Sequence, residues 1–242
     1  MNITLLVIWI STLFGTPQSF ITFQESEGLD HSAWTLLLQE NVTEDGFVDY
    51  PGFMKRKAEL EKYLNYLGKN EPSARQSKNE KLAFYINLYN AATVHLILEN
   101  YPLKSIKDID NPWGKNRIRL GNDMVSLSKI EFGILRKMNE PRIHFAINCA
   151  SYSCPKLMNK AYTSKGMELQ LQQATMSFIN DKTKNQISKK ELNLSPIFKW
   201  YRGDFMQKRS LISFLQPYST IDLQENTKLS YLPYDWSLNE KK

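Results

Sequence analysis

Reactive side chains are scarce in this sequence. The 242 residues contain two cysteines and three histidines, and both cysteines and His144 fall within one short segment. Three side chains are too few to complete a tetrahedral metal site. Their spacing, with four residues between neighbours, also suits such a site poorly. We therefore expect neither a metal site nor a bound cofactor.

The sequence also lacks the common nucleotide-binding and hydrolase motifs. Its ten glycines form no phosphate-binding loop or dinucleotide fingerprint, and no G-x-S-x-G segment occurs. The formal net charge is +6, but the chain contains no block of five or six like charges. This distribution indicates a solvated basic surface, and we expect no nucleic-acid partner.

The first 24 residues carry no charged side chain, and the first is Glu25. The apolar run from Ile3 to Phe14 has about the length of a signal-peptide core and is short for a membrane span. Small and turn-forming residues follow it, as they do near a cleavage site. The run lacks a preceding Lys or Arg, and an uncleaved buried helix is the alternative. We predict a signal peptide over residues 1–19, an exported (periplasmic or secreted) protein, and no integral membrane segment after cleavage.

Helical patterns dominate the rest of the chain. Apolar residues recur at helical spacing in segments 29–42, 54–70, 79–102, 129–138 and 164–182. Gly121-Asn122 between two short apolar segments predicts a hairpin, and the alternation in residues 142–150 predicts a strand. We expect a single α+β domain over residues 20–242, predominantly helical with a small, mainly antiparallel sheet.

Two polar features within the helical segments have alternative explanations. Asn87 and Asn90 lie in the most apolar helical segment, and buried amides must find hydrogen-bond partners. The first interpretation is that they bind the backbone of a neighbouring loop. Glu131 follows Ser128 by three residues, which matches a capping box at a helix start.

The segment "RIHFAINCASYSCPKL" holds both cysteines and permits three interpretations. Cys149 is a nucleophile where a strand turns towards a helix, with nearby backbone amides that lower its pKa and bind an oxyanion. Alternatively, Cys149 and Cys154 form a disulfide across a short loop. The third interpretation is that Cys149 is a buried apolar side chain.

A nucleophilic cysteine needs a base and a group that orients the base. On a regular strand His144 points away from Cys149, so the sequence favours His95 as the base and keeps His144 in reserve. Glu131 or Asn87 is the candidate orienting group. His31 lies near a helix start and is expected at the surface.

Four segments together resemble a known family. They are "KLAFYINLYNAATVHLILENYPLKSIKDI", "VSLSKIEFGILR", "RIHFAINCASYSCPKLMNKAYT" and "YDWSLN", in this order. The chain is identified by them, from Leu29 to Asn239, as similar to the domain of unknown function 547, which occurs in exported bacterial proteins. The resemblance implies a fold and a motif set but no reaction.

Family members that resemble this chain vary within the same motifs. Some have "CGSWSSP" where this chain has "CASYSCP", so Cys149 matches the wider pattern and Cys154 can be serine. Members with "YNA…H" like Tyr89 to His95 can lack a histidine at position 144, and this favours His95.

The sequence thus leads to two functional hypotheses. The first is an exported cysteine-dependent hydrolase or acyl-transferase with a peptidase-like site of Cys149, His95 or His144, and Glu131 or Asn87. Its substrate would be peptide-like or a small molecule. The alternative is a non-catalytic binding or scaffold module.

Overall fold

The computed structural model describes residues 28–207 and 209–242, so the predicted signal peptide lies outside the described residues. The α-helices are α1 (Ser32–Asn41), α2 (Tyr50–Lys55), α3 (Lys57–Lys69), α4 (Lys78–Asn100), α5 (Met167–Asn180), α6 (Ile197–Trp200), α7 (Arg202–Phe205) and α8 (Leu211–Leu215). The 3₁₀ helices are η1 (Ile106–Asp108), η3 (Arg136–Met138) and η4 (Pro141–Phe145), and η2 (Lys129–Leu135) is a π-helix. The strands are β1 (Ile118–Leu120), β2 (Asp123–Val125), β3 (Gln186–Ile187), β4 (Glu191–Leu194) and β5 (Lys228–Tyr231).

The strands form two small sheets, which confirms the α+β class. β1 and β2 pair antiparallel with Leu120 opposite Asp123, so Gly121-Asn122 is the turn, as predicted. Gly121 has a φ of +59°, a conformation that glycine adopts without strain. The second sheet has the order β3-β4-β5, with an antiparallel and a parallel pair. The parallel pair joins β4 to β5, which lies near the end of the chain. The short apolar segments in that region do not allow the strand pairing to be predicted from the sequence.

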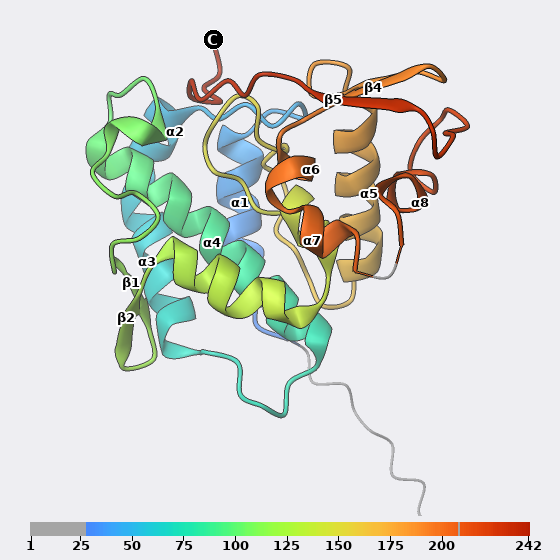
Figure 1. Ribbon diagram of the computed structural model, residues 1–242. Coiled ribbons are helices and arrows are strands. Elements are labelled where there is room, and N and C mark those ends of the chain that lie inside the picture. The colour runs from blue at the N-terminus through green and yellow to red at the C-terminus, as the bar shows by residue number, and fades with distance from the viewer. Residues whose placement is uncertain (1–27, 208) are drawn as a thin grey trace, which may run out of the picture.

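Helix α4 runs through the centre of the molecule, with α2, α3 and the β1–β2 hairpin on one side and α5–α8 on the other (Figure 1). Ser77 caps it, and Glu80 completes a capping box. Its sides are buried almost all round, which explains why it shows little amphipathic character. No helix among residues 28–207 and 209–242 is long and apolar enough to span a bilayer.

The two buried amides of α4 hold neighbouring backbone, as the first interpretation predicted. Asn87 donates to the carbonyl of Tyr162 (2.8 Å) and accepts from its N–H (3.0 Å). Asn90 donates to the carbonyl of Ala146 (2.9 Å) and accepts from the N–H of Asn148 (2.8 Å). Both ends of each amide are occupied by backbone, so Asn87 does not orient an imidazole.

The apolar core has two parts. The first cluster packs α1–α3 around α4, and the second packs α5–α8 against β4. Phe145 of η4 is central to the second, with its ring 5.2 Å from that of Phe178 and 5.6 Å from that of Phe205. Ile143, two residues earlier, belongs to the first. The η4 segment therefore lies between the two clusters.

The prediction of a strand over residues 142–150 is wrong, because this segment starts as the 3₁₀ helix η4. Pro141 occupies its first turn, and the Glu140 side chain accepts from the N–H of Arg142. Residues 143–147 are all buried, so their alternation did not mark one buried face. The whole segment is enclosed between the two clusters.

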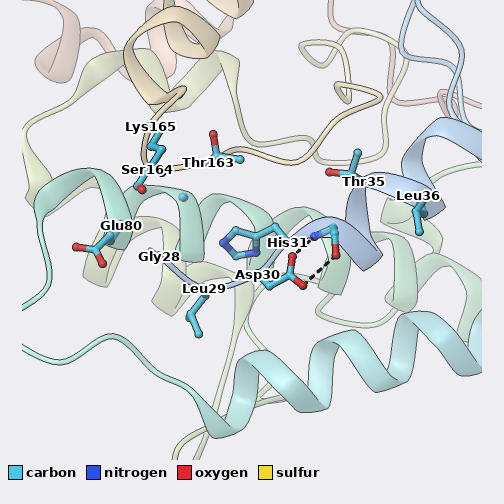
Figure 2. Close-up of a pocket in the computed structure, with 12 residues that line it drawn as sticks. Gly28, Leu29, Asp30, His31, Thr35, Leu36, Glu80, Thr163, Ser164 and Lys165 are labelled. Atoms are coloured by element: carbon cyan, nitrogen blue, oxygen red, sulfur yellow. Dashed lines mark hydrogen bonds between the residues drawn. The ribbon is translucent and has the colours of Figure 1, made fainter. Parts of the chain in front are cut away.

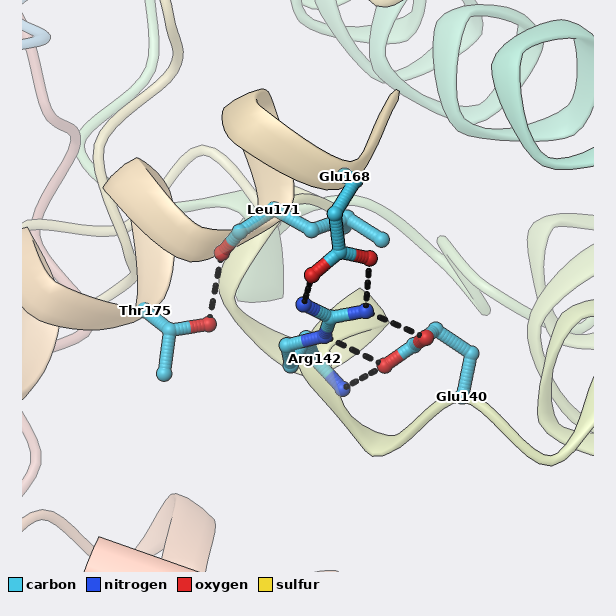
Figure 3. A network of polar contacts seen from close by, with 5 residues as sticks. All are labelled: Glu140, Arg142, Glu168, Leu171 and Thr175. Atoms are coloured by element: carbon cyan, nitrogen blue, oxygen red, sulfur yellow. Dashed lines mark hydrogen bonds and ion pairs between the residues drawn. The ribbon is translucent and has the colours of Figure 1, made fainter. Parts of the chain in front are cut away.

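Arg142 anchors η4 to α5. Its guanidinium lies between the carboxylates of Glu140 and Glu168, with N–O distances of 2.6–2.8 Å (Figure 3). These hydrogen bonds raise the pKa of Arg142 above its ordinary value despite partial burial. The ion pairs thus hold the start of η4 against the first turn of α5.

Candidate active site

Cys149 lies in a loop that the Asn148 side chain closes. Asn148 donates to the carbonyl of Pro155 (2.7 Å) and accepts from the N–H of Ala150 (2.8 Å). Ala150 has a φ of +61°, a left-handed conformation that costs a residue with a side chain about 1 kcal/mol or more. We call residues 148–155 the cysteine loop. Because Asn90 of α4 binds its first amide, the loop is fixed to the central helix.

Most backbone amides of the cysteine loop are already hydrogen-bonded. The N–H groups of Tyr152 and Ser153 donate to carbonyls of Ser237 and Asp235, at 2.7 and 3.1 Å. That of Cys154 donates to the Ser151 carbonyl (3.0 Å). These amides are not free to form the oxyanion site that the sequence suggested after Cys149.

The thiol of Cys149 is surrounded by donors. Its Sγ lies 3.1 Å from Oγ of Ser151 and 3.3 Å from the hydroxyl of Tyr234. A hydrogen bond with Cys154 has the largest effect on the pKa of Cys149 and lowers it, whereas burial raises it. Hydrogen bonds with the Ser151 and Tyr234 hydroxyls and with the Ser151 amide lower the pKa further. The pKa of Cys149 is lowered to about 7, so a large fraction is thiolate at neutral pH.

Cys154 supports Cys149 without being bonded to it. Both cysteines are free thiols in the structure, so the disulfide interpretation is not realised there. The Cys149 N–H lies 2.9 Å from the Cys154 sulfur. Burial, followed by the neighbouring Cys149, raises the pKa of Cys154 well above its ordinary value. The two thiols are thus strongly unequal: Cys149 is the acidic one.

Cys149 opens into a cavity of about 280 Å³ between the two apolar clusters. His144, Glu131 and Cys154 also line it. The remaining wall is mainly aromatic, with side chains of Tyr89, Trp113, Phe132, Trp200, Tyr201, Tyr234 and Trp236. The cavity therefore combines a reactive thiol, an imidazole, a carboxylate and an apolar surface, which is the usual composition of a small-molecule site.

His144 is paired with an acid that the sequence reasoning missed. Its Nε2 lies 2.7 Å from Oδ2 of Asp204 on α7, and its ring stacks on Tyr201 at 3.8 Å. Arg136 donates to both oxygens of the same carboxylate, at 2.6 and 2.8 Å. Although burial opposes the shift, hydrogen bonds from His144 and Arg136 hold the pKa of Asp204 well below its ordinary value.

A sequence signal for Asp204 existed. Tyr201, Asp204 and Phe205 occupy positions i, i+3 and i+4, which share a face in a helix. Aromatic side chains are commonly buried, so an acid on their face is expected close to the core. The sequence ranks His144 below His95 as the base because a regular strand would point His144 away from Cys149. Residues 141–145 form a 3₁₀ helix, so this argument does not apply.

Glu131 is a cavity residue and not a helix cap. The predicted capping box is wrong, because the Ser128 side chain makes no cap bond and Ser126 accepts from the N–H of Lys129 instead (3.1 Å). Glu131 is buried and accepts from Tyr201 (2.6 Å) and Tyr89 (3.3 Å). It makes no hydrogen bond to His144, so Asp204 and not Glu131 orients the imidazole.

His95, the base that the sequence favoured, does not line this cavity. It lies in another hollow on α4, where its ring nitrogens are 3.3 Å from Glu61 and 3.7 Å from Glu99. Asn87 also lies outside the cavity lining. Of the predicted site residues, the structure brings together Cys149, His144 and Glu131.

His31 is buried and not at the surface as expected. It lies in a third hollow with Asp30, Ser32 and Thr35, in which Asp30 binds Ser32 (Figure 2). Its Nδ1 is 2.7 Å from the hydroxyl of Tyr63, and burial lowers its pKa to about 4. In the part of the chain that the structure describes, no three His, Cys, Asp or Glu side chains converge as a metal site requires.

Comparison with known proteins finds a family match in the central part of the chain. A family model described as "Protein of unknown function, DUF547" matches residues 73–179. This segment includes Glu131, His144 and Cys149, whereas Asp204 and Tyr234 follow it. No curated protein and no solved structure matches the chain. The resemblance seen in the sequence is confirmed over residues 73–179, where the chain matches this family of unknown function.

Proposed function

We propose that the protein is a cysteine-dependent hydrolase or acyl-transferase with Cys149 as nucleophile. One observation carries the proposal: a thiol with a pKa lowered to about 7 shares a cavity with a histidine that is bound to a carboxylate. These are the three parts of a nucleophile, base and orienting acid. His144 is the base, and Asp204 holds its ring.

The tautomer of His144 follows from its partner. Because Asp204 accepts from Nε2, the proton of a neutral His144 lies on Nε2 and the basic lone pair on Nδ1. No hydrogen bond joins His144 to Cys149 among the described residues. Proton transfer between them therefore passes through the substrate or a water molecule in the cavity.

The reaction would proceed in two steps. The proton of Cys149 first passes to Nδ1 of His144, through water or the substrate. The Cys149 thiolate then attacks a carbonyl carbon, the bond to the leaving group breaks, and the amine or alcohol departs with that proton, which leaves a thioester. Water or another acceptor then attacks the thioester while Nδ1 of His144 takes its proton, and Cys149 is released. Both half-reactions balance without a cofactor.

The negative charge on the carbonyl oxygen needs donors other than the occupied loop amides. Tyr234 and Ser151 lie against the sulfur, and their own contact is 2.9 Å. When the thiolate bonds to the carbonyl carbon it loses its charge, so the Tyr234 hydroxyl is released to donate to the carbonyl oxygen, which carries the charge in the tetrahedral intermediate. Removing one such donor typically costs about 100-fold or more in rate.

Selective alkylation tests the proposal. Iodoacetamide at pH 7, followed by peptide mass spectrometry, should modify Cys149 at least about tenfold faster in the folded chain than in urea, and Cys154 far more slowly. The lowered pKa and accessible cavity predict this order. Cys149→Ser is the matched control, and Cys154→Ser confirms the assignment. A folded-state rate at Cys149 no greater than the rate in urea contradicts the proposal.

The aromatic wall favours a second candidate, a binding module without catalysis. Cys149 is hydrogen-bonded on several sides, and the nearby amides are occupied, as in a rigid binding pocket. In that case Cys149→Ser leaves ligand binding unchanged, and no thioester forms with activated esters such as p-nitrophenyl acetate. Burst release of p-nitrophenol that Cys149→Ser abolishes favours the enzyme.

A further inference from the structure

We propose that the cavity beside Cys149 selects substrates that carry a positively charged ammonium group. This inference rests on the proposed function, since it names the substrate class of the same site. It follows from the charge and the chemistry of the cavity wall.

Glu131 is the charged residue of the wall. Among the described residues that line the cavity, no other is Asp, Glu, Lys or Arg. Glu131 is 4% exposed and accepts from two tyrosine hydroxyls, one on each oxygen. Each carboxylate oxygen can accept more than one hydrogen bond, so acceptor capacity remains towards the cavity. A buried carboxylate without an ion pair is stabilised by a cationic ligand.

The cationic side chain of Arg136, which lies beside the cavity wall, is already paired with Asp204. Arg136 lies 5.6 Å from the ring of Tyr201 and 4.9 Å from that of Phe132, but its donors bind both oxygens of Asp204. Arg136 and Asp204 neutralise each other, so Glu131 carries the uncompensated charge among the described residues that line the cavity. Formation of the Cys149 thiolate adds to it.

Aromatic faces complete a cation site. Trp113, Trp200, Tyr234 and Trp236 form one group, with ring centroids 4.5–5.9 Å apart. Trp236 already attracts one cation, because Nζ of Lys107, which is not part of the cavity lining, lies 5.2 Å from its ring. Indole and phenol faces bind ammonium groups, and they bind them more strongly where water is excluded.

Charged thiol reagents test the inference. Methyl methanethiosulfonate is neutral, and its 2-(trimethylammonium)ethyl and 2-sulfonatoethyl analogues are cationic and anionic. Each transfers its sulfur substituent to a thiolate as a mixed disulfide and releases methanesulfinate. We expect the cationic-to-anionic rate ratio at Cys149 to exceed the ratio measured in urea by about tenfold or more.

Two variants and a control locate the origin of the preference. Glu131→Gln keeps the shape of the side chain and should bring the normalised ratio close to one. Trp200→Leu, at a side chain that is 48% exposed, should lower it severalfold and tests the aromatic wall if Glu131→Gln is poorly folded. Glu61→Gln, in the separate hollow around His95, should leave it unchanged. A normalised ratio of one in the unsubstituted chain overturns the inference.

A reversible probe separates this inference from the proposed function. Choline and its neutral isostere 3,3-dimethylbutan-1-ol are titrated against intrinsic tryptophan fluorescence, which reports on the three tryptophans of the wall. We expect choline to bind about tenfold more tightly. If no reagent modifies Cys149, the proposed function fails and choline binding alone decides the inference. Equal binding of the two probes overturns it.

Discussion

Asp204 and His144 lie 60 positions apart in the sequence, and their side chains meet at 2.7 Å. The contact joins α7 to η4, and Arg136 joins both to the start of η3 through the same carboxylate. One acid thus orients the proposed base and ties three segments together. Its removal should affect reactivity and stability at once.

Asp204→Asn should destabilise the fold by about 2 kcal/mol, since it replaces charge-assisted hydrogen bonds with neutral ones. The pKa of Asp204 is lowered in the fold, so its contribution is present above the carboxyl's unfolded pKa and is lost as pH falls. Urea unfolding at pH 7 and pH 3 should show a smaller difference between variant and parent at pH 3.

The same variant should slow acylation of Cys149 by an activated ester about 100-fold or more, because His144 loses its orientation. Asp45→Asn is the control. Asp45 also pairs with a basic residue, Lys156, but its side chain is 79% exposed, so little change is expected. Equal effects of the two substitutions would remove Asp204 from the proposed site.

The alkylation rate of Cys149 should rise with pH through a midpoint near 7, as its pKa requires. Tyr234→Phe removes one donor to the thiolate, so the midpoint should move up towards the ordinary pKa of a cysteine. Stopped-flow alkylation between pH 5.5 and 9.5 measures both curves. The unfolded chain gives the reference midpoint, and a folded midpoint that coincides with it would disprove the activation of Cys149.

Asn90 and Asn87 form a matched pair on one helix. Each holds a backbone segment by two hydrogen bonds, so alanine at either position should cost about 2–3 kcal/mol of folding free energy. Only Asn90 holds the cysteine loop. Asn90→Ala should therefore slow labelling of Cys149, whereas Asn87→Ala should leave it within about twofold at a temperature where both are folded. Equal rates in the two variants would mean that the loop does not depend on α4.

The sequence predicted those parts of the fold that depend on local pattern. Helix α4 and the Gly121-Asn122 turn follow from short-range signals, and the buried amides follow from the need to satisfy polar groups. It failed at η4, because alternation marks a strand only when one face is buried. Here Ile143 and Phe145 enter two different clusters, so both faces are enclosed.

The candidate site was predicted only in part. Cys149 and Glu131 could be identified by residue type, although Glu131 was explained as a cap. The pairing of His144 with Asp204 depends on how α7 packs on η4, a contact between distant segments that periodicity does not encode. His95 was favoured because the strand geometry placed His144 on the wrong face, and that geometry does not exist.

His31 should make the fold sensitive to mild acid. Burial lowers its pKa from 6.5 to about 4, so the folded chain keeps it neutral while the unfolded chain binds a proton. Stability is full above the unfolded pKa and is lost as pH falls from about 6.5 to about 4, by about 3 kcal/mol. His31→Asn, which can still accept from Tyr63, should flatten this part of the curve. Urea unfolding between pH 4 and 7 measures the slope, and an unchanged slope would assign the sensitivity to another group.

Oxidation should switch off Cys149 through its neighbour. The two cysteines adjoin within one short loop, and Cys149 supplies the thiolate. Diamide, which accepts the two hydrogen atoms, should form an intrachain disulfide with a mass loss of about 2 Da. Labelling of Cys149 should then cease and return with dithiothreitol. In Cys154→Ser the thiol should stay available after the same treatment, apart from adducts between chains. A diamide-treated parent chain that labels as fast as before would show that the loop holds the sulfurs too rigidly to join.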